Sequence, residues 1–320
     1  MTSPDETRVS EPPVPRLLTV GAAQLGPIPK SDDRQTTVGR LIALLHQAAE
    51  RNCQLVVFPE AALTPFFPHW YMTDDAEIDS YFETELPNSH TQPLFDEAAR
   101  LGIGFALGYC ELAVEADRKR RFNSSILVDS RGAIVGKYRK IHLPGYDRPG
   151  EDNIFENLEK YYFEVGDLGW PVWRAFGGNV GMMICNDRRW PEAYRVMGLQ
   201  EVELIVLGYN TPYTGVKGLD EAPHLPMFQN TLSMQAGAYQ NATWVVGVAK
   251  AGVEEGVHQI GGTCIISPLG EAVARAMTEA DELVCATIDL DVASKRKQAL
   301  NFAVNRRVEH YGLITENETF

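Results

Sequence analysis

Three polar residues of this sequence each follow directly on a strand-like run. Glu60 comes after LVVFP, Lys140 after VGKYR and Cys185 after VGMMI. Ligands of open α/β sheets gather beyond the carboxyl ends of the strands, so we expect these three side chains to share one pocket. In such a pocket a carboxylate, an ammonium and a thiol could act as general base, oxyanion stabiliser and nucleophile.

Each of these signals is weak by itself. A glutamate after a strand often caps a helix or lies on the surface, the lysine could be a plain loop cation, and cysteine is among the residues most often fully buried. We expect the remaining four cysteines in the core, since each lies in or beside an apolar run: Cys53, Cys110, Cys264 and Cys285. Five widely spaced cysteines without CxxC pairs or His/Cys clusters indicate neither a disulfide framework nor a metal site. The pattern favours a reducing, cytoplasmic setting and implies no metal and no organic cofactor.

The elements that must position these residues alternate between short β-rich runs and longer helical patterns. The hydrophobic periodicity predicts strands at 17–24, 54–59, 104–112, 122–129, 133–139, 172–176, 179–184, 204–207, 243–249, 262–267, 271–276 and 283–289. It predicts helices at 33–52, 75–84, 91–101, from about 191, and at 226–240. Alternation of this kind, with several hairpins, is typical of a layered α/β sandwich whose mixed sheets are covered by helices.

Composition and charge limit the class of partner. The chain has 43 acidic and 29 basic residues, a formal net charge of −14, and no apolar stretch of membrane-spanning length. An acidic surface repels phosphate groups, so we expect no nucleic acid and no membrane as partner. The one dense basic run, RKRR at 118–121, is interpreted as a solvated loop.

The chain divides into one large domain with two flanking segments. Residues 1–16 are polar, acidic and proline-rich, which predicts a mobile extension with no signal peptide. Residues 17–291 form the predicted domain, within which 140–167 is expected to be a long functional loop. Residues 292–320 form a tail too irregular to divide into elements.

Several long segments, in the same order along the chain, resemble the nitrilase, or carbon–nitrogen hydrolase, superfamily. They are FPEAALTPFFP (58–68), RRFNSSILVD (120–129), GKYRKIHLPG (136–145), LEKYYFEVGDLG (158–169), MMICNDRRWPEAYRVMGL (182–199), GYNTP (208–212) and LSMQAGAYQN (232–241). Within that superfamily they are most similar to the N-carbamoyl-D-amino acid amidohydrolase branch. The resemblance extends from about Leu17 to Leu313. It implies a four-layer α-β-β-α sandwich, cysteine-dependent cleavage of a carbamoyl or amide C–N bond, and a homodimer or homotetramer with the 292–320 tail in its interface.

The resemblance also implies catalytic roles. Cys185 would attack the carbonyl carbon, Glu60 would carry the proton, and Lys140 would stabilise the oxyanion. Glu159 matches the family's second glutamate, which positions the lysine; a plain surface salt bridge is the alternative for it.

Two arginines follow the nucleophile closely. A guanidinium fork can bind a carboxylate through two hydrogen bonds, and the resemblance gives Arg188 and Arg189 that role toward the free acid of an N-carbamoyl amino acid. The alternative is a structural charge network with Asp187 and Glu192.

Four further residues belong to the implied substrate site. Asn186 follows the nucleophile, and Asn210 and Thr211 match pocket-lining positions, although a strand-end turn would explain the last two equally well. His142 is retained from the family pattern, and a lone histidine is more often a satisfied hydrogen-bonding group than a catalyst.

The chain departs from the branch at four positions where histidines are usual: Tyr146, Asn157, Gln229 and Asn230. The three catalytic positions are intact, so these changes affect the choice of substrate, and a related ureido acid or amide stays open beside the carbamoyl amino acid. A nitrile hydrolase using the same triad also stays open, as does a non-catalytic scaffold that keeps the fold. A scaffold would be expected to have lost part of the triad.

Overall fold

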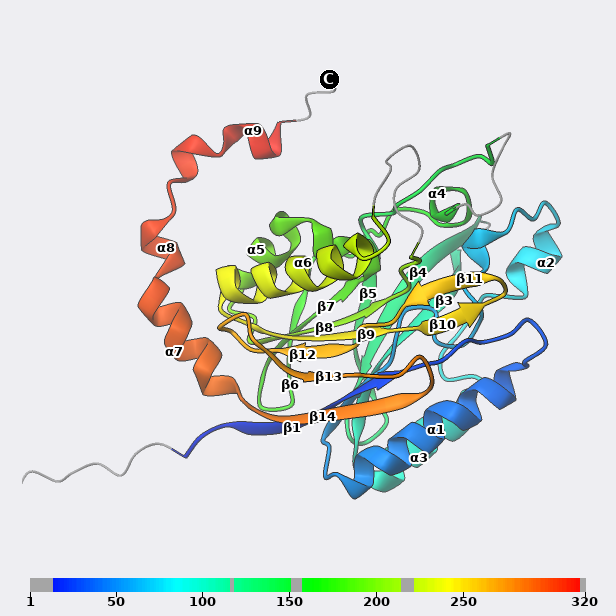
Figure 1. Ribbon diagram of the computed structural model, residues 1–320, viewed down its shortest axis with the longest axis horizontal. Coiled ribbons are helices and arrows are strands. Elements are labelled where there is room, and N and C mark those ends of the chain that lie inside the picture. Colours follow the sequence, from blue (N-terminus) through cyan, green and yellow to red (C-terminus); the bar gives the residue numbers. More distant parts are fainter. Residues whose placement is uncertain (1–13, 116–117, 151–156, 214–221, 317–320) are drawn as a thin grey trace, which may run out of the picture.

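Two six-stranded mixed sheets face each other in the computed structural model, which describes residues 14–115, 118–150, 157–213 and 222–316 (Figure 1). The order of the first sheet is β14–β1–β2–β3–β4–β5, and that of the second is β13–β12–β9–β8–β7–β6. Helices cover the outer faces of both sheets, which confirms the predicted α-β-β-α sandwich.

The strand bounds follow the predicted runs closely. The first sheet contains β1 (Leu17–Gln24), β2 (Leu55–Val57), β3 (Gly104–Glu115), β4 (Arg118–Val128), β5 (Ile134–Arg139) and β14 (Glu282–Asp289). The second contains β6 (Val172–Ala175), β7 (Gly178–Ile184), β8 (Leu204–Tyr209), β9 (Trp244–Ala249), β12 (Cys264–Ile266) and β13 (Ala272–Arg275). A separate hairpin, which the sequence did not predict, is formed by β10 (Ala251–Glu254) and β11 (Val257–Ile260).

Two helix pairs complete the layers. The first sheet packs against α1 (Arg34–Glu50) and α3 (Gln92–Leu101), and the second against α5 (Pro191–Gly198) and α6 (Leu225–Asn241). The start of α1 is set by Asp33, whose side chain accepts a hydrogen bond from the Thr36 amide. One apolar core lies between α1, α3 and the first sheet, and a larger one fills the space between the sheets and beneath α5 and α6.

Strand direction brings the polar strand ends together. In the first sheet β2 and β3 are parallel, and β5 runs the same way as β3 because each is antiparallel to β4. In the second sheet β7, β8 and β9 are parallel. The carboxyl ends of β2 and β5 therefore lie at one end of their sheet, as those of β7 and β8 do in the second.

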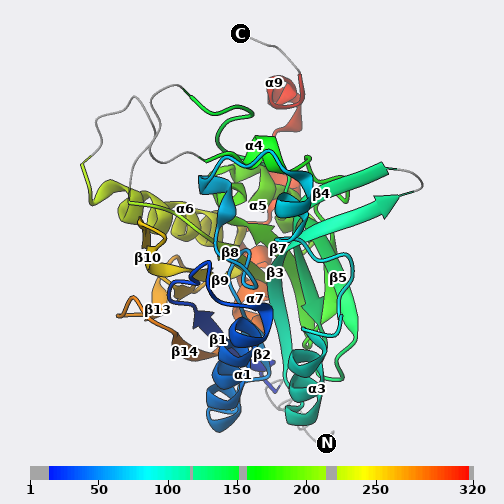
Figure 2. The same ribbon diagram turned by 90° about the vertical axis from the view of Figure 1, so that its right-hand side faces the viewer.

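The basic run at 118–121 is part of a strand, so its interpretation as a solvated loop was wrong. It opens β4, which pairs with the end of β3 in a hairpin arm that extends beyond the neighbouring strands (Figure 2). Acidic side chains from α2 (Asp75–Asp79) and from residues 164–167 pair with these cations. Residues 118–121 adopt a strand conformation because their backbone pairs with β3. Their positive charges are neutralised by the nearby acidic side chains.

Short helices occupy three segments that the sequence analysis left without elements. The segment 140–167 contains α4 (Glu159–Tyr162), and a 3₁₀ turn, η1 (Phe67–His69), lies against it through the Leu158 amide and the Pro68 carbonyl. A second 3₁₀ turn, η2 (Cys185–Arg189), follows β7.

The tail after β14 contains helices and leads away from the body of the molecule (Figure 1). It consists of α7 (Leu290–Leu300), α8 (Phe302–Asn305), η3 (Val308–His310) and α9 (Gly312–Thr315). The helix α7 buries Ala293 and Lys297 against the body. At the opposite terminus, Arg16 pairs with Glu203 and Asp291, whereas residues 1–13 of the predicted extension lie outside the described part.

None of the helices in the described ranges is long and apolar enough to cross a bilayer.

Candidate active site

Glu60 lies between the two sheets, where backbone from both approaches it. A side chain at Gly108 of β3 would meet the Pro59 carbonyl oxygen at 2.5 Å, and one at Gly208 of β8 would overlap the Glu60 amide nitrogen. Only glycine allows the three segments to come this close. The Glu60 side chain is fully buried. Its position is thus fixed by strands on both sides.

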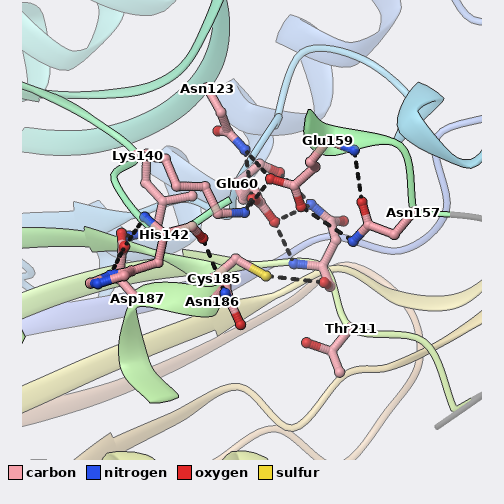
Figure 3. Close-up of polar contacts among 12 residues, drawn as sticks. Glu60, Asn123, Lys140, His142, Asn157, Glu159, Cys185, Asn186, Asp187 and Thr211 are labelled. Atoms are coloured by element: carbon pink, nitrogen blue, oxygen red, sulfur yellow. Dashed lines mark hydrogen bonds and ion pairs between the residues drawn. The ribbon is translucent and has the colours of Figure 1, made fainter. Parts of the chain in front are cut away.

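Lys140 lies between two buried carboxylates. Its Nζ is 2.7 Å from Glu60 Oε1 and 2.5 Å from Glu159 Oε2, and all three side chains are inaccessible to solvent (Figure 3). Lys140 follows β5 directly, and Glu159 is the first residue of α4. The geometry rules out an exposed salt bridge for Glu159, because the pair is completely enclosed.

Cys185 reaches the same cluster from the second sheet. It follows β7 with a φ of 46°, a left-handed conformation that is uncommon for residues with a side chain. Its Sγ lies 3.3 Å from the Asn210 carbonyl oxygen, and the Asn210 amide donates to Glu60 Oε2 at 2.8 Å. One residue after β8 therefore connects the thiol to the carboxylate, and Glu60, Lys140 and Cys185 meet in one place as the sequence predicted.

The pKa values of the two carboxyl groups depend on burial and on the fact that both share the single ammonium of Lys140. Burial by itself would raise the pKa of Glu60, but Lys140 and hydrogen bonds from Asn123 and Asn210 outweigh it and hold that pKa below its usual value. Burial raises the pKa of Glu159 to about 7, with Lys140 opposing the shift and Glu60 adding to it. Of two carboxylates that share one ammonium, Glu159 is the one that takes up a proton more readily.

The pKa values of Lys140 and Cys185 depend on the same surroundings. Burial would lower the pKa of Lys140, but the facing Cys185, Glu159 and Glu60 keep it above its usual range, so the ammonium is stable. Burial and the charge of Glu60 raise the pKa of the Cys185 thiol, although Lys140 and Arg188 oppose them. The resting thiol is therefore protonated and needs a base before it can attack.

Asn123 is a site residue that the sequence analysis missed. From the middle of β4 its Nδ2 donates to Glu60 Oε1 at 2.7 Å and lies 3.5 Å from Glu159 Oε2. Its only sequence signal was its place inside the matched segment RRFNSSILVD, because an asparagine within a strand has no distinctive spacing. Asn210, predicted to line the substrate pocket, likewise holds Glu60, through both its backbone and side-chain amides.

The two arginines have different surroundings. Arg188 is buried, donates to the Cys185 carbonyl at 2.6 Å and to Thr211 Oγ1 at 2.8 Å, and lies over the Tyr209 ring. Arg189 is exposed and donates to Asn186 Oδ1 at 3.0 Å. Arg188 thus supports the backbone of Cys185, and Arg189 is the arginine with access to solvent.

His142 is a hydrogen-bonded and stacked residue rather than an isolated one. Its Nδ1 lies 2.9 Å from Asp187 Oδ1, and its ring stacks between Trp170 and Trp190. Asp187 also accepts hydrogen bonds from the Tyr138 hydroxyl and the Ile184 amide, so it is committed to this cluster rather than to a network with the arginines.

A cavity of about 350 Å³ borders the site. Its lining includes His142, Asn186 and Trp190, together with Lys160 and Phe163 from the segment after Glu159. A space of this volume is large enough for a small molecule, and it lies next to the residues that follow Cys185.

Comparison with known proteins places this chain in a family. A model of the carbon–nitrogen hydrolase family matches residues 19–298. The chain belongs to the carbon–nitrogen hydrolase family. It is 29% identical to the N-carbamoylputrescine amidase of Arabidopsis thaliana, over 89% of this chain and 91% of that protein, and 31% identical to a nitrilase of Pyrococcus abyssi, over 84% and 89%. A solved carbon–nitrogen hydrolase from Helicobacter pylori has the same fold, with a TM-score of 0.80 and 22% identity, covering 95% of this chain and 100% of that one.

The positions where this carbon–nitrogen hydrolase lacks the expected histidines have local partners. The Asn157 side-chain oxygen accepts from the Glu159 amide at 3.1 Å, and its carbonyl accepts from the Tyr146 amide. Asn230 is buried on α6 and donates to the Tyr209 hydroxyl at 3.1 Å, next to Gln229. Among the described residues, no group of three or more His, Cys, Asp or Glu side chains could hold a metal ion.

Proposed function

We propose that this carbon–nitrogen hydrolase is a thiol amidohydrolase that cleaves an N-carbamoyl amino acid or a related ureido acid through a covalent intermediate on Cys185. One observation carries the proposal. The Cys185 thiol shares a buried, hydrogen-bonded cluster with the carboxylate of Glu60 and the ammonium of Lys140. These are the nucleophile, base and oxyanion stabiliser that the reaction needs.

The first half of the reaction forms the acyl-enzyme. Glu60 takes the thiol proton as Sγ attacks the carbamoyl carbon, and the carbonyl oxygen becomes an oxyanion. Lys140 and the backbone N–H of Asn186 stabilise that charge in a site shielded from solvent. Glu60 then gives its proton to the leaving nitrogen, and the C–N bond breaks.

The second half releases the acyl group. Glu60 takes a proton from water, which attacks the thioester carbon, and the Cys185 sulfur leaves and regains a proton. Throughout, Glu159 and Asn123 keep Lys140 and Glu60 in place. Every proton in this cycle is carried by a side chain of the cluster or by the attacking water.

Charge next to the nucleophile supports a substrate with a carboxylate. Arg189 is exposed at the end of η2, the turn that begins with Cys185, and its guanidinium suits a carboxylate in two-bond geometry. The carbamoyl group is supported by the name of one relative, N-carbamoylputrescine amidase. In this chain the positive charge beside Cys185 favours an anionic group at the far end of the substrate.

A substrate panel tests the proposal. Ammonia release is measured with D- and L-N-carbamoyl amino acids, β-ureido acids, simple amides and nitriles. We expect turnover of a ureido acid and none in Cys185→Ala. Arg189→Gln should raise KM for acidic substrates and leave KM for neutral amides unchanged. Turnover confined to nitriles, or a fully active Cys185→Ala, would contradict the proposal.

A further inference from the structure

Two cysteines outside the active site have their sulfur atoms in contact. Cys53 lies between α1 and β2, and Cys285 lies on β14 at the edge of the first sheet. Their Sγ atoms are 3.3 Å apart, and both thiols are free. The two residues are 232 positions apart in the chain, so the fold alone brings them together.

A glycine lies beside this contact. The strand β1 lies between β14 and β2, and Gly21 of β1 is paired with Cys285. A Cβ atom at Gly21 would lie 3.4 Å from Cys53 Sγ and 3.0 Å from Leu283 Cδ1. The Cys53 sulfur reaches across β1, past Gly21, to the edge strand.

The two thiols differ in exposure and in their neighbours. Cys53 is buried, whereas Cys285 is partly exposed and has Arg51 Nη1 4.0 Å from its sulfur. The hydrogen bond from Cys53 and the nearby Arg51 lower the pKa of Cys285 to about 6, with burial opposing them. The same hydrogen bond and burial raise the pKa of Cys53. One accessible thiolate next to one buried thiol is the arrangement of an attacking and a resolving cysteine.

We propose that Cys53 and Cys285 form a reversible oxidation site that a hydroperoxide converts into a disulfide. The Cys285 thiolate attacks one peroxide oxygen, the O–O bond breaks, and the sulfur becomes a sulfenic acid as hydroxide leaves. The Cys53 sulfur then attacks the Cys285 sulfur, the S–O bond breaks, and the thiol proton leaves with hydroxide as water. Two thiols are oxidised to one disulfide. Hydrogen peroxide is reduced to two molecules of water, and an organic hydroperoxide is reduced to an alcohol and water. The sulfurs have to approach by about 1 Å to reach bonding distance.

The site is separate from the catalytic machinery. Cys53 precedes β2 and Glu60 follows it, so the two lie at opposite ends of that strand. The Cys185 thiol is buried and has a raised pKa, which makes it a poorer target for peroxide than Cys285. We therefore expect the pair to be oxidised first, with ureido acid turnover retained. The cross-link ties β14, and the tail that follows it, to the end of α1.

Peptide mapping of the full chain tests the proposal. The reduced protein is treated with hydrogen peroxide, free thiols are alkylated, and the digest is analysed by mass spectrometry. We expect one linked pair of peptides containing Cys53 and Cys285, lost on treatment with dithiothreitol. Oxidised protein should also show a higher Tm, because a cross-link over a long loop restricts the unfolded chain.

One test variant and one control variant show whether Cys53 is the partner of Cys285. In Cys53→Ser the partner thiol is gone, so Cys285 should advance to sulfinic acid under the same treatment. Cys110→Ser removes a buried thiol from the same sheet and should leave the linked peptides unchanged. Wild-type Cys53 that stays alkylatable while Cys285 is over-oxidised, or a protein in which neither reacts before Cys185, would overturn the proposal.

Discussion

At the scale of single residues, the site holds two carboxylates and one ammonium in a space closed to solvent. Glu60 has a lowered pKa and Glu159 a raised one, although both contact Lys140 Nζ. The difference arises because Asn123 and Asn210 donate to Glu60, and Glu159 has fewer donors. Glu60 is therefore kept ionised, as the proposed role of base requires, and the proton that titrates near neutrality belongs to Glu159.

Glu159 predicts the pH dependence of the rate. Its pKa of about 7 lies above the ordinary value for glutamic acid, so it is neutral below about pH 7 and ionised above. The ionised form adds negative charge next to Glu60 and makes Glu60 a stronger base. We expect kcat/KM to rise with pH through this range. Glu159→Gln keeps a hydrogen bond to Lys140, and its pH–rate profile should lose that limb, with a rate roughly tenfold lower. If kcat/KM of this variant still rises with pH through the same range, the rise is caused by another titrating group.

Asn123 should matter for catalysis rather than for folding. Asn123→Ala removes the 2.7 Å hydrogen bond to Glu60, and we expect kcat to fall about tenfold or more with KM little changed. Ser125→Ala is the matched control, since Ser125 lies two residues further along β4 and its hydroxyl contacts the Met182 sulfur. Equal losses in both variants would show that the strand, and not the Asn123 amide, is responsible.

The sequence predicted the three residues of the proposed triad, but not all of the residues that hold them in place. Glu60, Lys140 and Cys185 each follow a strand, which is visible in the hydrophobic pattern. Asn123 lies within a strand, and its contact with Glu60 depends on how β4 aligns with β2 two strands away. The resemblance gave Arg188 a role toward a substrate carboxylate, which stays a prediction, and its hydrogen bonds to the Cys185 carbonyl and Thr211 had no sequence signal. Such contacts depend on three-dimensional packing that no local pattern reports.

At the scale of elements, the position of Glu60 depends on close contact between the backbones of β3, β8 and the segment that follows β2. Gly108 and Gly208 face the Pro59–Glu60 peptide from the two sheets. A methyl group on either would push the carboxylate away from Lys140 or separate the sheets.

Gly208→Ala tests this close packing. The added Cβ would overlap the Glu60 amide nitrogen, so we expect kcat to fall at least about tenfold, with some loss of stability. Gly39→Ala is the control, because Gly39 is exposed on α1 and an added Cβ there meets no atom within 4 Å. That change should leave the rate unchanged and raise the free energy of unfolding by roughly 0.5–1 kcal/mol. Full activity in Gly208→Ala would mean that Glu60 is positioned by its side-chain contacts alone.

The order of strands and helices could be predicted because hydrophobic period and turn residues are local signals. Two misjudged segments show the limit. Residues 118–121 are charged in every position, yet they form a strand because β3 pairs with them and acidic side chains neutralise them. The turn α4 is only four residues long and has no helical periodicity to detect.

At the scale of the whole molecule, the tail carries exposed apolar side chains. Within the described part of the tail, large exposed hydrophobic residues follow α7: Val304, Val308, Leu313 and Ile314. An interface between two copies of the chain would remove these side chains from water. The sequence-based expectation of a homodimer or homotetramer with the tail in the interface stays a prediction.

Sedimentation measurements test that expectation. We expect the full chain to associate and a chain ending at Asn301 to shift toward monomer, because α7 and its buried Lys297 are kept while the exposed segment is removed. Leu313→Ser with Ile314→Ser should weaken association without truncation. A full chain that sediments as a monomer at every concentration would contradict the interface.

The reactive groups come from opposite halves of the sandwich: Glu60 and Lys140 from one sheet, Cys185 and Asn210 from the second. During folding, a chain whose halves are formed but still apart therefore carries a thiol without its base, and a base without its thiol. Recovery of hydrolysis after denaturation would consequently mark the moment when the halves close, later than any signal from secondary structure.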